Sequence, residues 1–167
     1  MTNNMHATIA ICTWNRSDLL DKTLIQMREL EIPAGTQWEI VVVNNRCTDN
    51  TDDVLARHAA ALPLRRIFED KQGQSHARNA AAQAARGDLV VWTDDDVLVD
   101  RHWLAEMLVA ARARPECSFF GGPIEPWFAH DPPQWLLDNW ALINGAFAFR
   151  DLGNEHFEFD LKRLPYG

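Results

Sequence analysis

The chain has 167 residues, of which 47% are hydrophobic and 24% are charged, and its formal net charge is −8. This length and apolar content predict a globular chain with one core, and the negative charge argues against a nucleic-acid partner or a general anionic-membrane surface. Cys12, Cys47 and Cys117 lack the spacing of a metal site, and no apolar run approaches the roughly 20 residues that span a bilayer. We therefore expect a cytoplasmic protein with reduced thiols.

Apolar runs of strand length alternate four times with segments of helical periodicity. The strands are expected at residues 7–13, 38–43, 64–68 and 88–93. The helices are expected to start at Ser17, near Thr51, after Gly73 and at Asp100, with Ser17 and Asp100 as N-caps. Because the connections are short, we predict right-handed βαβ crossovers and an α/β fold with a mostly parallel, doubly wound sheet.

Polar clusters stand at the carboxyl ends of all four expected strands. They cover residues 13–16, 44–49, 73–79 and 94–96. In sheets of this type, ligands bind beyond the carboxyl ends of the strands, where the strand order reverses. We therefore expect the four clusters to converge on a single cleft.

Three consecutive aspartates, Asp94, Asp95 and Asp96, follow the last expected strand, which is apolar enough to be buried. Their carboxylates repel one another, and Mg²⁺ or Mn²⁺ would offset that repulsion. The alternative is a solvated loop that caps the next helix, but Asp100 already supplies that cap. Because carboxylates alone leave the metal shell incomplete, a nucleoside diphosphate is the expected partner, and the cation would neutralise the charge on the departing diphosphate.

Other candidate groups have two interpretations each. Gly73 and Arg78 lie at a helix start, where exposed amides can meet an anion, although such a loop is weak support on its own. Trp14 follows a strand and either stacks on a nucleobase or packs against the protein. Asn44 and its neighbour Asn45 either read a base edge or form an Asx turn.

Aromatic residues are frequent from Phe119 onward, where regular periodicity fades. One interpretation is a second core packed over the sheet. The other is an aromatic wall for a sugar or lipid-like acceptor, for which Trp127, Trp135 and Trp140 are the best candidates because segments flanked by proline tend to lie at the surface.

Four segments match one family in order and spacing. They are residues 12–16, 41–51, 73–79 and 87–96. Over residues 7 to about 125 the sequence resembles the family 2 glycosyltransferases of GT-A fold. The resemblance implies metal-dependent, inverting transfer of a sugar from a nucleotide-sugar donor, first of all a UDP-sugar, to a hydroxyl of a saccharide or lipid-linked acceptor. It also implies polysaccharide biosynthesis and peripheral association with the inner membrane.

The resemblance assigns roles to residues of this chain. Thr13 and Trp14 would line the base and ribose pocket, and Asn44 would face the nucleobase. The loop from Gly73 to Arg78 would close over the donor. Asp94 would meet the ribose or the sugar, and Asp95 or Asp96 would hold the metal, because the motif can be laid over the triplet in two ways.

Two departures from the family pattern limit these assignments. The family commonly has Asp where this chain has Asn44, so the choice of nucleotide stays open. Residues 1–120 correspond to the donor-binding half, whereas residues 121–167 correspond only to the start of the acceptor side, which normally supplies an acidic general base. The acids in that region have no distinguishing spacing; they are Asp151, Glu155, Glu158 and Asp160.

Two other enzyme classes with a similar sheet require different residues after the first strand. A nucleotidyltransferase should have a Gly-rich, basic loop after its first strand, and an aspartate phosphotransferase should have an Asp nucleophile there. Residues 12–18 supply neither. A truncated module that binds metal and nucleotide without turnover stays open as a third possibility.

Overall fold

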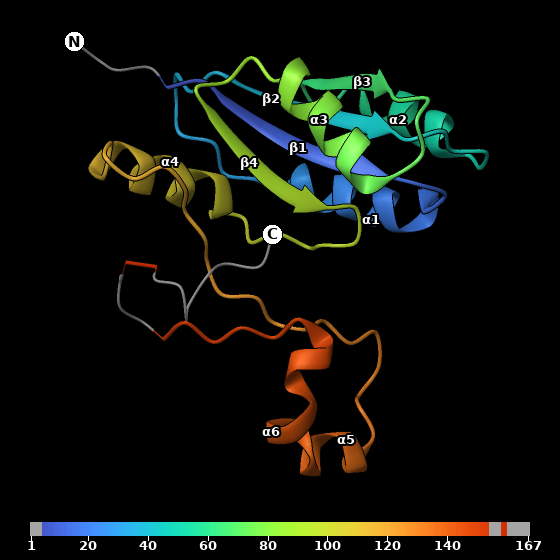
Figure 1. Ribbon diagram of the computed structural model, residues 1–167, viewed down its shortest axis with the longest axis vertical. Coiled ribbons are helices and arrows are strands. Elements are labelled where there is room, and N and C mark those ends of the chain that lie inside the picture. The colour runs from blue at the N-terminus through green and yellow to red at the C-terminus, as the bar shows by residue number, and fades with distance from the viewer. Residues whose placement is uncertain (1–4, 154–157, 160–167) are drawn as a thin grey trace. The chain divides into compact units, whose positions relative to one another are not determined.

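The computed structural model describes residues 5–153 and 158–159. The chain divides into two compact units, residues 1–116 and 117–167, and each is described by itself. The first unit contains a sheet of four strands, β1 (Ala7–Thr13), β2 (Trp38–Asn44), β3 (Leu64–Phe68) and β4 (Leu89–Asp94). The strands pair in parallel in the order β3-β2-β1-β4 (Figure 1). The predicted parallel sheet is therefore confirmed.

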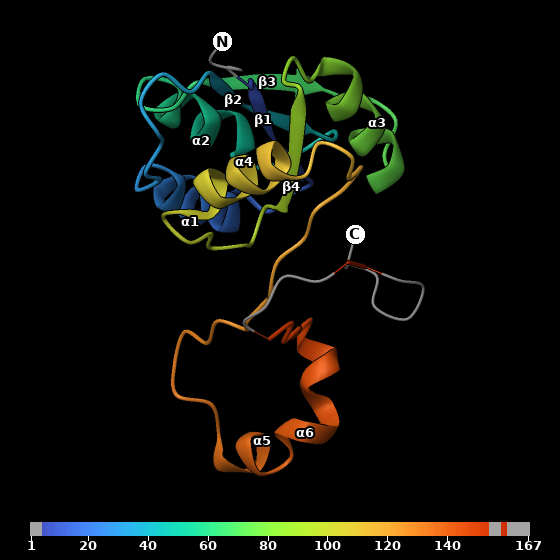
Figure 2. The same cartoon turned by 90° about the vertical axis from the view of Figure 1, so that its left-hand side faces the viewer.

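Helices cover both faces of this sheet, as a doubly wound fold requires. Figure 2 shows α3 (Gln74–Ala84) on one side and α1 (Ser17–Met27), α2 (Thr51–His58) and α4 (Trp103–Ala113) on the other. Side chains alternate between the two faces of a strand. Ile9 and Ile11 accordingly join the larger core beneath α1, α2 and α4, while Ala10 faces α3. Burying each such Ile contributes roughly 1.5–3 kcal/mol.

The face under α3 is built from small side chains. Ala77 and Ala81 of α3 pack against Ala10, Val41 and Val43 of the two central strands. Because alanine side chains are short, the helix can lie close to the sheet. This packing fixes the position of the α3 N-terminus beside the carboxyl end of β1.

Strand β4 differs from the buried strand that its apolar sequence predicted. Among its residues only Val91 is buried, and Trp92 has 43% of its surface exposed. The reason is its position in the sheet, because β4 pairs with β1 on one side and is an edge strand within the part of the chain that the structure describes. An apolar run in the sequence does not by itself distinguish an edge strand from a central strand of a sheet.

The predicted N-caps Ser17 and Asp100 are both wrong in detail. Helix α1 does begin at Ser17, but the carboxylate of Asp49, from the loop after β2, accepts the hydrogen bond of the Ser17 N–H at 2.9 Å. Asp49 also accepts from the N–H of Thr51, so one side chain serves the starts of α1 and α2. Asp100 accepts from the N–H of His102 and stabilises a turn, and α4 begins only at Trp103.

The second unit contains short elements around a cluster of aromatic rings. It has α5 (Gln134–Asp138), α6 (Trp140–Ile143) and a 3-10 helix, η1 (Asn144–Phe147). Phe128, Trp140, Phe147 and Phe149 lie with ring centroids 5.5–6.3 Å apart. These rings form a cluster that includes Trp140, but none of them is fully buried: Phe147 is exposed and the other three are half-buried.

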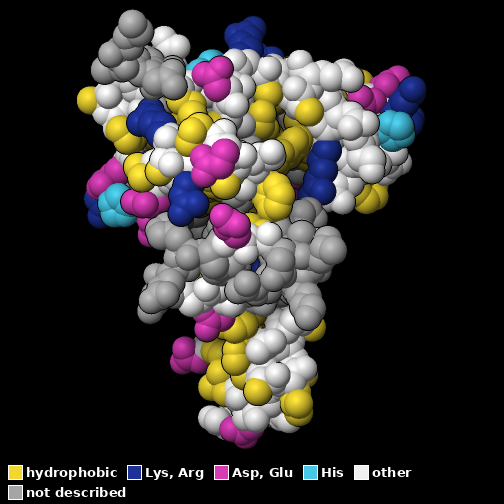
Figure 3. Space-filling view, turned by 60° about the vertical axis from the view of Figure 1, so that its left-hand side comes forward, with side chains coloured by type: hydrophobic (Ala, Val, Ile, Leu, Met, Phe, Trp, Pro, Cys, Tyr) yellow, Lys and Arg dark blue, Asp and Glu magenta, His cyan; other side chains and the backbone are white. Residues whose placement is uncertain are grey.

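Two of the three tryptophans predicted as an acceptor wall lie on the surface of this unit. Trp127 has 64% and Trp135 has 63% of its surface exposed. Figure 3 shows hydrophobic side chains on the surface of the molecule, including this unit. None of the helices in residues 5–153 has both the length and the apolar character to cross a membrane.

Candidate functional site

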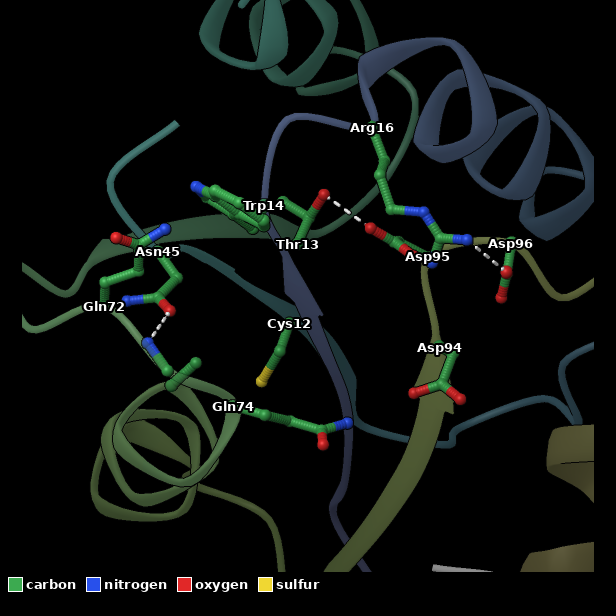
Figure 4. A pocket seen from close by; sticks show the side chains of 12 residues that line it. Cys12, Thr13, Trp14, Arg16, Asn45, Gln72, Gln74, Asp94, Asp95 and Asp96 are labelled. Atoms are coloured by element: carbon green, nitrogen blue, oxygen red, sulfur yellow. Dashed lines mark hydrogen bonds and ion pairs between the residues drawn. The ribbon is translucent and has the colours of Figure 1, made fainter. Parts of the chain in front are cut away.

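A cavity of about 420 Å³ lies at the carboxyl ends of β1 and β4, beside the N-terminus of α3 (Figure 4). The residues that line it come from all four predicted polar clusters, together with Cys12 and Gln72. They are Cys12, Thr13, Trp14, Arg16, Asn45, Gln72, Gly73, Gln74, Ala77, Asp94, Asp95 and Asp96. The parallel register explains this convergence, because Cys12 of β1 lies opposite Asp94 of β4.

The turn after β1 places an aromatic and a basic side chain at the cavity. Trp14 is half exposed and lines the cavity. Asn15 adopts a left-handed backbone conformation with φ 53°, which is uncommon for a residue with a side chain. Its Oδ1 accepts a hydrogen bond of 2.7 Å from the N–H of Thr48, and this bond holds the turn. The chain thereby directs Arg16 toward the end of β4.

Asp95 is the buried member of the acidic triplet, with 3% of its surface exposed. Its Oδ2 accepts from the hydroxyl of Thr13 at 2.7 Å, and its Oδ1 accepts from Arg16 at 2.9 Å. Burial raises the pKa of Asp95, although the Thr13 hydrogen bond and the Arg16 charge oppose the rise. Both carboxylate oxygens are thus engaged by the protein, which leaves Asp95 less available to a metal.

Asp94 and Asp96 are exposed and have oxygens available. Asp96 Oδ2 accepts from Arg16 at 2.8 Å, and no contact to its Oδ1 is present among the described residues. Asp94 has neither a hydrogen bond nor an ion pair with any residue that the structure describes. Carboxylate oxygens are the hard ligands that Mg²⁺ and Mn²⁺ prefer. Within the described ranges no group of three or more side chains that could hold a metal ion occurs, so the protein side chains alone would not complete a metal shell.

The two asparagines after β2 have separate roles. Asn44 is buried and does not line the cavity: its Nδ2 donates to Asp52 and its Oδ1 accepts from the N–H of Cys47, both at 2.7 Å. That second bond is a local turn, one of the two interpretations considered for this segment. Asn45 does line the cavity. Its Nδ2 donates to the carbonyls of Glu69 and Lys71, and its Oδ1 accepts from the N–H of Gly73.

Asn45 therefore holds the loop that leads into α3. Gly73 has φ 138° in this loop, a conformation that favours glycine. Helix α3 begins at Gln74, so its first backbone N–H groups lie beside the cavity. Arg78 is one turn further along the helix and is not among the lining residues, but its charge acts on the Cys12 thiol. Burial, the larger effect, raises the pKa of Cys12 to about 11.

Most of the predicted site residues do meet at this cavity, and several lining residues were missed. Thr13, Trp14, Gly73 and the three aspartates line it, whereas Asn44 and Arg78 do not. Asn45, for which the sequence left two interpretations open, lines it as well. The missed residues are Cys12, Arg16, Gln72, Gln74 and Ala77. Arg16 and Cys12 belong to the same sequence segment as Thr13 and Trp14, so their position after the first strand was the available signal.

The four acids of the expected acceptor side, none of which the sequence singles out as a general base, fall in the second unit. Asp151 is exposed and accepts a hydrogen bond of 2.8 Å from the N–H of Gly153. Glu158 is also exposed. Glu155 and Asp160 lie outside the described residues. A general base among these acids therefore stays untested.

Comparison with known proteins identifies the family. The family model described as "Glycosyl transferase family 2" matches residues 8–161, and the chain belongs to this family. Validoxylamine A glucosyltransferase of Streptomyces hygroscopicus subsp. limoneus is 32% identical over 175 residues, which cover 94% of this chain and 38% of that protein. Succinoglycan biosynthesis protein ExoM of Rhizobium meliloti is 23% identical over 134 residues, covering 79% of this chain and 43% of that protein.

Solved structures show the same architecture. The mannosyltransferase PcManGT from Pyrobaculum calidifontis, in complex with GDP-Man and Mn²⁺, is similar with a TM-score of 0.58 and 32% identity over 64% of this chain and 32% of that chain. TarS of S. aureus in complex with UDP-GlcNAc has a TM-score of 0.59 at 21% identity, over 66% of this chain and 32% of that one. The fold is therefore of the GT-A type. The chain spans less than half the length of these relatives.

Proposed function

We propose that this chain carries the donor-binding part of a glycosyltransferase that moves a sugar from a nucleotide-sugar donor to an acceptor hydroxyl, with inversion at the sugar carbon. The single observation that carries this proposal is the cavity at the ends of β1 and β4, where Asp94 and Asp96 offer carboxylate oxygens beside the N-terminus of α3. The solved structure of the mannosyltransferase PcManGT with GDP-Man and Mn²⁺ supports it.

Each lining group has a part in holding the donor. Trp14 stacks on the nucleobase, since half of its surface is exposed at the cavity. Thr13 and Asp94 face the ribose or sugar. The backbone N–H groups of Gly73 and Gln74, at the positive end of the α3 dipole, receive the diphosphate oxygens. A UDP-sugar is the first donor to test, and a GDP-sugar is the second, because Asn44 is turned away from the cavity and leaves base choice to other groups.

Asp96, with Asp94 beside it, holds Mg²⁺ or Mn²⁺. When bound, the ion neutralises charge on the departing diphosphate and so assists the leaving group. Asp95 helps to fix the positions of Asp94 and Asp96, because its own carboxylate is held by hydrogen bonds from Thr13 and Arg16.

The transfer is a single displacement. An acceptor oxygen forms a bond to the anomeric carbon of the sugar while the bond from that carbon to the diphosphate oxygen breaks, and the electron pair leaves with the nucleoside diphosphate. The acceptor proton passes to a carboxylate base, to which we assign no residue. The acceptor is a saccharide or lipid-linked saccharide in a polysaccharide pathway, reached by a cytoplasmic enzyme that associates peripherally with the inner membrane. The name of ExoM, a succinoglycan biosynthesis protein, supports this acceptor class.

Nucleotide binding tests the proposal directly. Thermal unfolding and calorimetry with UDP or GDP, each with and without Mn²⁺, should show stabilisation that needs both nucleotide and ion. Asp96→Asn should lose it, while the control Asp53→Asn, an exposed acid of α2, should keep it. Absence of nucleotide binding under all these conditions would overturn the proposal. Binding without any donor hydrolysis or transfer would leave a nucleotide- and metal-binding module.

A further inference from the structure

Arg16 is the only Lys, Arg or His side chain among the twelve described residues that line the cavity. Its guanidinium spans two members of the acidic triplet. One terminal nitrogen lies 2.9 Å from Asp95 Oδ1, and the other lies 2.8 Å from Asp96 Oδ2. Figure 4 shows this side chain reaching from the turn after β1 to the end of β4. A positive group therefore already neutralises Asp96, one of the two carboxylates to which the cation would bind.

The chain places this charge where local structure does not favour it. Arg16 immediately precedes α1, and its carbonyl accepts the first hydrogen bonds of that helix. A cation at a helix N-terminus is disfavoured by the helix dipole. The preceding residue, Asn15, has a left-handed conformation that is held by contacts to Cys47 and Thr48. Helix stability does not explain the position of Arg16, whereas its two carboxylate contacts do.

The two contacts differ in how easily they can be broken. The Asp95 side chain is 4% exposed and also accepts from Thr13, so losing Arg16 would leave a buried carboxylate with less compensation. The Asp96 side chain is 38% exposed and the Arg16 side chain 46% exposed. Exposed ion pairs contribute little to stability because water screens and replaces them. The contact with Asp96 is accordingly the one that can be given up.

We propose that Arg16 substitutes for the divalent cation in the cation-free protein, where its guanidinium neutralises Asp95 and Asp96. When the cation binds with its nucleotide, Arg16 keeps its contact with Asp95 and releases Asp96. This inference rests on the function proposed above. Two positive groups repel each other strongly at contact distance, so a cation on Asp96 and a guanidinium on the same carboxylate compete.

The released end of Arg16 then has a new partner available. A guanidinium carries five N–H donors in a planar fork that matches phosphate oxygens. The nitrogen that leaves Asp96 already lies at the cavity, where the diphosphate of the donor would lie. The same residue thus opposes binding of the cation alone and favours binding of the cation together with a nucleoside diphosphate, which makes cation binding depend on the nucleotide.

The test is titration of Mn²⁺ followed by electron paramagnetic resonance, first with Mn²⁺ alone and then with UDP or GDP. Arg16→Gln removes the competing charge. We expect Mn²⁺ alone to bind roughly tenfold more tightly to this variant than to the wild-type protein. We expect the nucleotide to bind less tightly in the presence of Mn²⁺, because a phosphate contact is lost. If Arg16 had a purely structural role, Arg16→Gln would weaken both the binding of Mn²⁺ alone and the binding of the nucleotide with Mn²⁺.

Two further variants support the interpretation. Arg57→Gln is the matched control, since Arg57 is an exposed arginine paired with Asp21 on the α1 and α2 side and does not line the cavity. Mn²⁺ binding should be unchanged in it. Arg16→Lys keeps a charge that cannot bridge both carboxylates, so Mn²⁺ alone should bind with an affinity between those of the wild type and Arg16→Gln. This variant decides the matter if Arg16→Gln does not fold.

The outcomes separate the two proposals. Unchanged or weaker binding of Mn²⁺ alone to the Arg16 variants, in a protein that still binds nucleotide with Mn²⁺, overturns the role of Arg16 and leaves the proposed function standing. If the wild-type protein and all variants bind no nucleotide with Mn²⁺, the proposed function fails, and the role of Arg16 fails with it. Tighter binding of Mn²⁺ alone to Arg16→Gln supports both.

Discussion

The hydroxyl of Thr13 donates a hydrogen bond of 2.7 Å to Oδ2 of Asp95, although 82 positions separate the two residues in the sequence. The parallel pairing of β1 with β4 brings these strand ends together. The bond fixes the one acid of the triplet that is buried and turns it toward Arg16. The position of the acidic cluster is therefore set by contacts between strands, and not by the loop after β4 alone.

Replacing this hydroxyl should loosen the site. Thr13→Val keeps the shape of the side chain but leaves Asp95 Oδ2 without its donor, so we expect the free energy of unfolding to fall by about 1–2 kcal/mol. Nucleotide binding with Mn²⁺ should weaken as well, because Arg16 and Asp95 lose their fixed arrangement. Urea unfolding and calorimetry measure the two effects. Thr13→Ser retains the hydroxyl and should behave nearly as the wild type; equal losses in Val and Ser variants would contradict the explanation.

Glu39 should make the stability of the first unit depend on acid pH. Burial would raise the pKa of Glu39, but hydrogen bonds from Arg65, from the N–H of Arg86 and from the Thr8 hydroxyl outweigh it and hold the pKa below the ordinary value of 4.5. The folded state thus favours the charged form. The resulting stabilisation is present above pH 4.5 and is lost as the pH falls through the lowered pKa.

Glu39→Gln removes this dependence. The variant should be less stable than the wild type near pH 7, on the order of 2–3 kcal/mol, because Arg65 loses a charged partner. The difference should shrink as the pH is lowered from about 7 to about 3. Thermal unfolding across that range measures it. Glu29→Gln, at an exposed position of the turn after α1, serves as the control and should show the wild-type profile; a parallel loss in both variants would be inconsistent with our assignment.

Gly87 permits a close approach of two backbones at the other end of the sheet. A Cβ atom added there would lie 2.6 Å from the backbone N of Thr8 and 2.7 Å from the carbonyl carbon of Ala7. The backbone of β1 cannot move away without breaking its pairing with β4. Gly87→Ala should therefore destabilise the first unit by roughly 3 kcal/mol or more.

Urea unfolding measures the effect of this substitution, with Gly122→Ala as the control because a Cβ there meets no atom within 4 Å. If Gly87→Ala unfolds at the same urea concentration as the wild type, the backbone at the start of β4 can shift to accommodate a Cβ atom, and our explanation is wrong.

The sequence was sufficient for the architecture because strand and helix periodicities are local. Apolar runs and Ala-rich segments predict strands and helices without knowledge of their neighbours, and short connections then restrict the topology to parallel crossovers. The site was predictable in outline for the same reason, since every strand end of a parallel sheet lies on one edge. Thr13, Trp14 and the aspartates follow directly from that rule.

Local sequence patterns could not predict hydrogen bonds and ion pairs between residues that are distant in the sequence. Ser17 has the chemistry of an N-cap, yet Asp49 takes that role from another loop. Asn44 and Asn45 are chemically identical neighbours, but only the second reaches the loop before α3. Arg16 pairs with Asp95 across 79 positions. Each of these depends on which side chains the fold brings together, and a single sequence does not contain that information in its spacing.

Cys12 should react slowly despite lining the cavity. Burial, opposed by the charge of Arg78, raises the pKa of its thiol to about 11 from 9.0. Because the thiolate is the reactive form, alkylation by iodoacetamide near pH 8 should be about 100-fold slower than for an unperturbed thiol. Peptide mapping by mass spectrometry follows the reaction at this position. The same peptide labelled in urea provides the reference rate, and rapid labelling of the folded protein would disprove the predicted shift.

The aromatic residues of the second unit should divide into a structural and a surface group. Trp140 contacts Phe128, Phe147 and Phe149, so Trp140→Ala should destabilise this unit by roughly 2–3 kcal/mol. Trp135 is 63% exposed, and Trp135→Ala should leave both units folded. Near-ultraviolet circular dichroism and limited proteolysis distinguish these outcomes.

The variant Trp135→Ala also tests the acceptor role of the exposed rings. If Trp127 and Trp135 contact the acceptor, Trp135→Ala should leave binding of UDP or GDP with Mn²⁺ unchanged and reduce transfer to a saccharide acceptor, with hydrolysis of the donor retained. Exposed rings stack on sugar faces at a modest gain each, so a loss of roughly three- to tenfold in transfer is expected. A loss of nucleotide binding instead would mean that this tryptophan supports the donor site, and unchanged transfer would remove it from the acceptor surface.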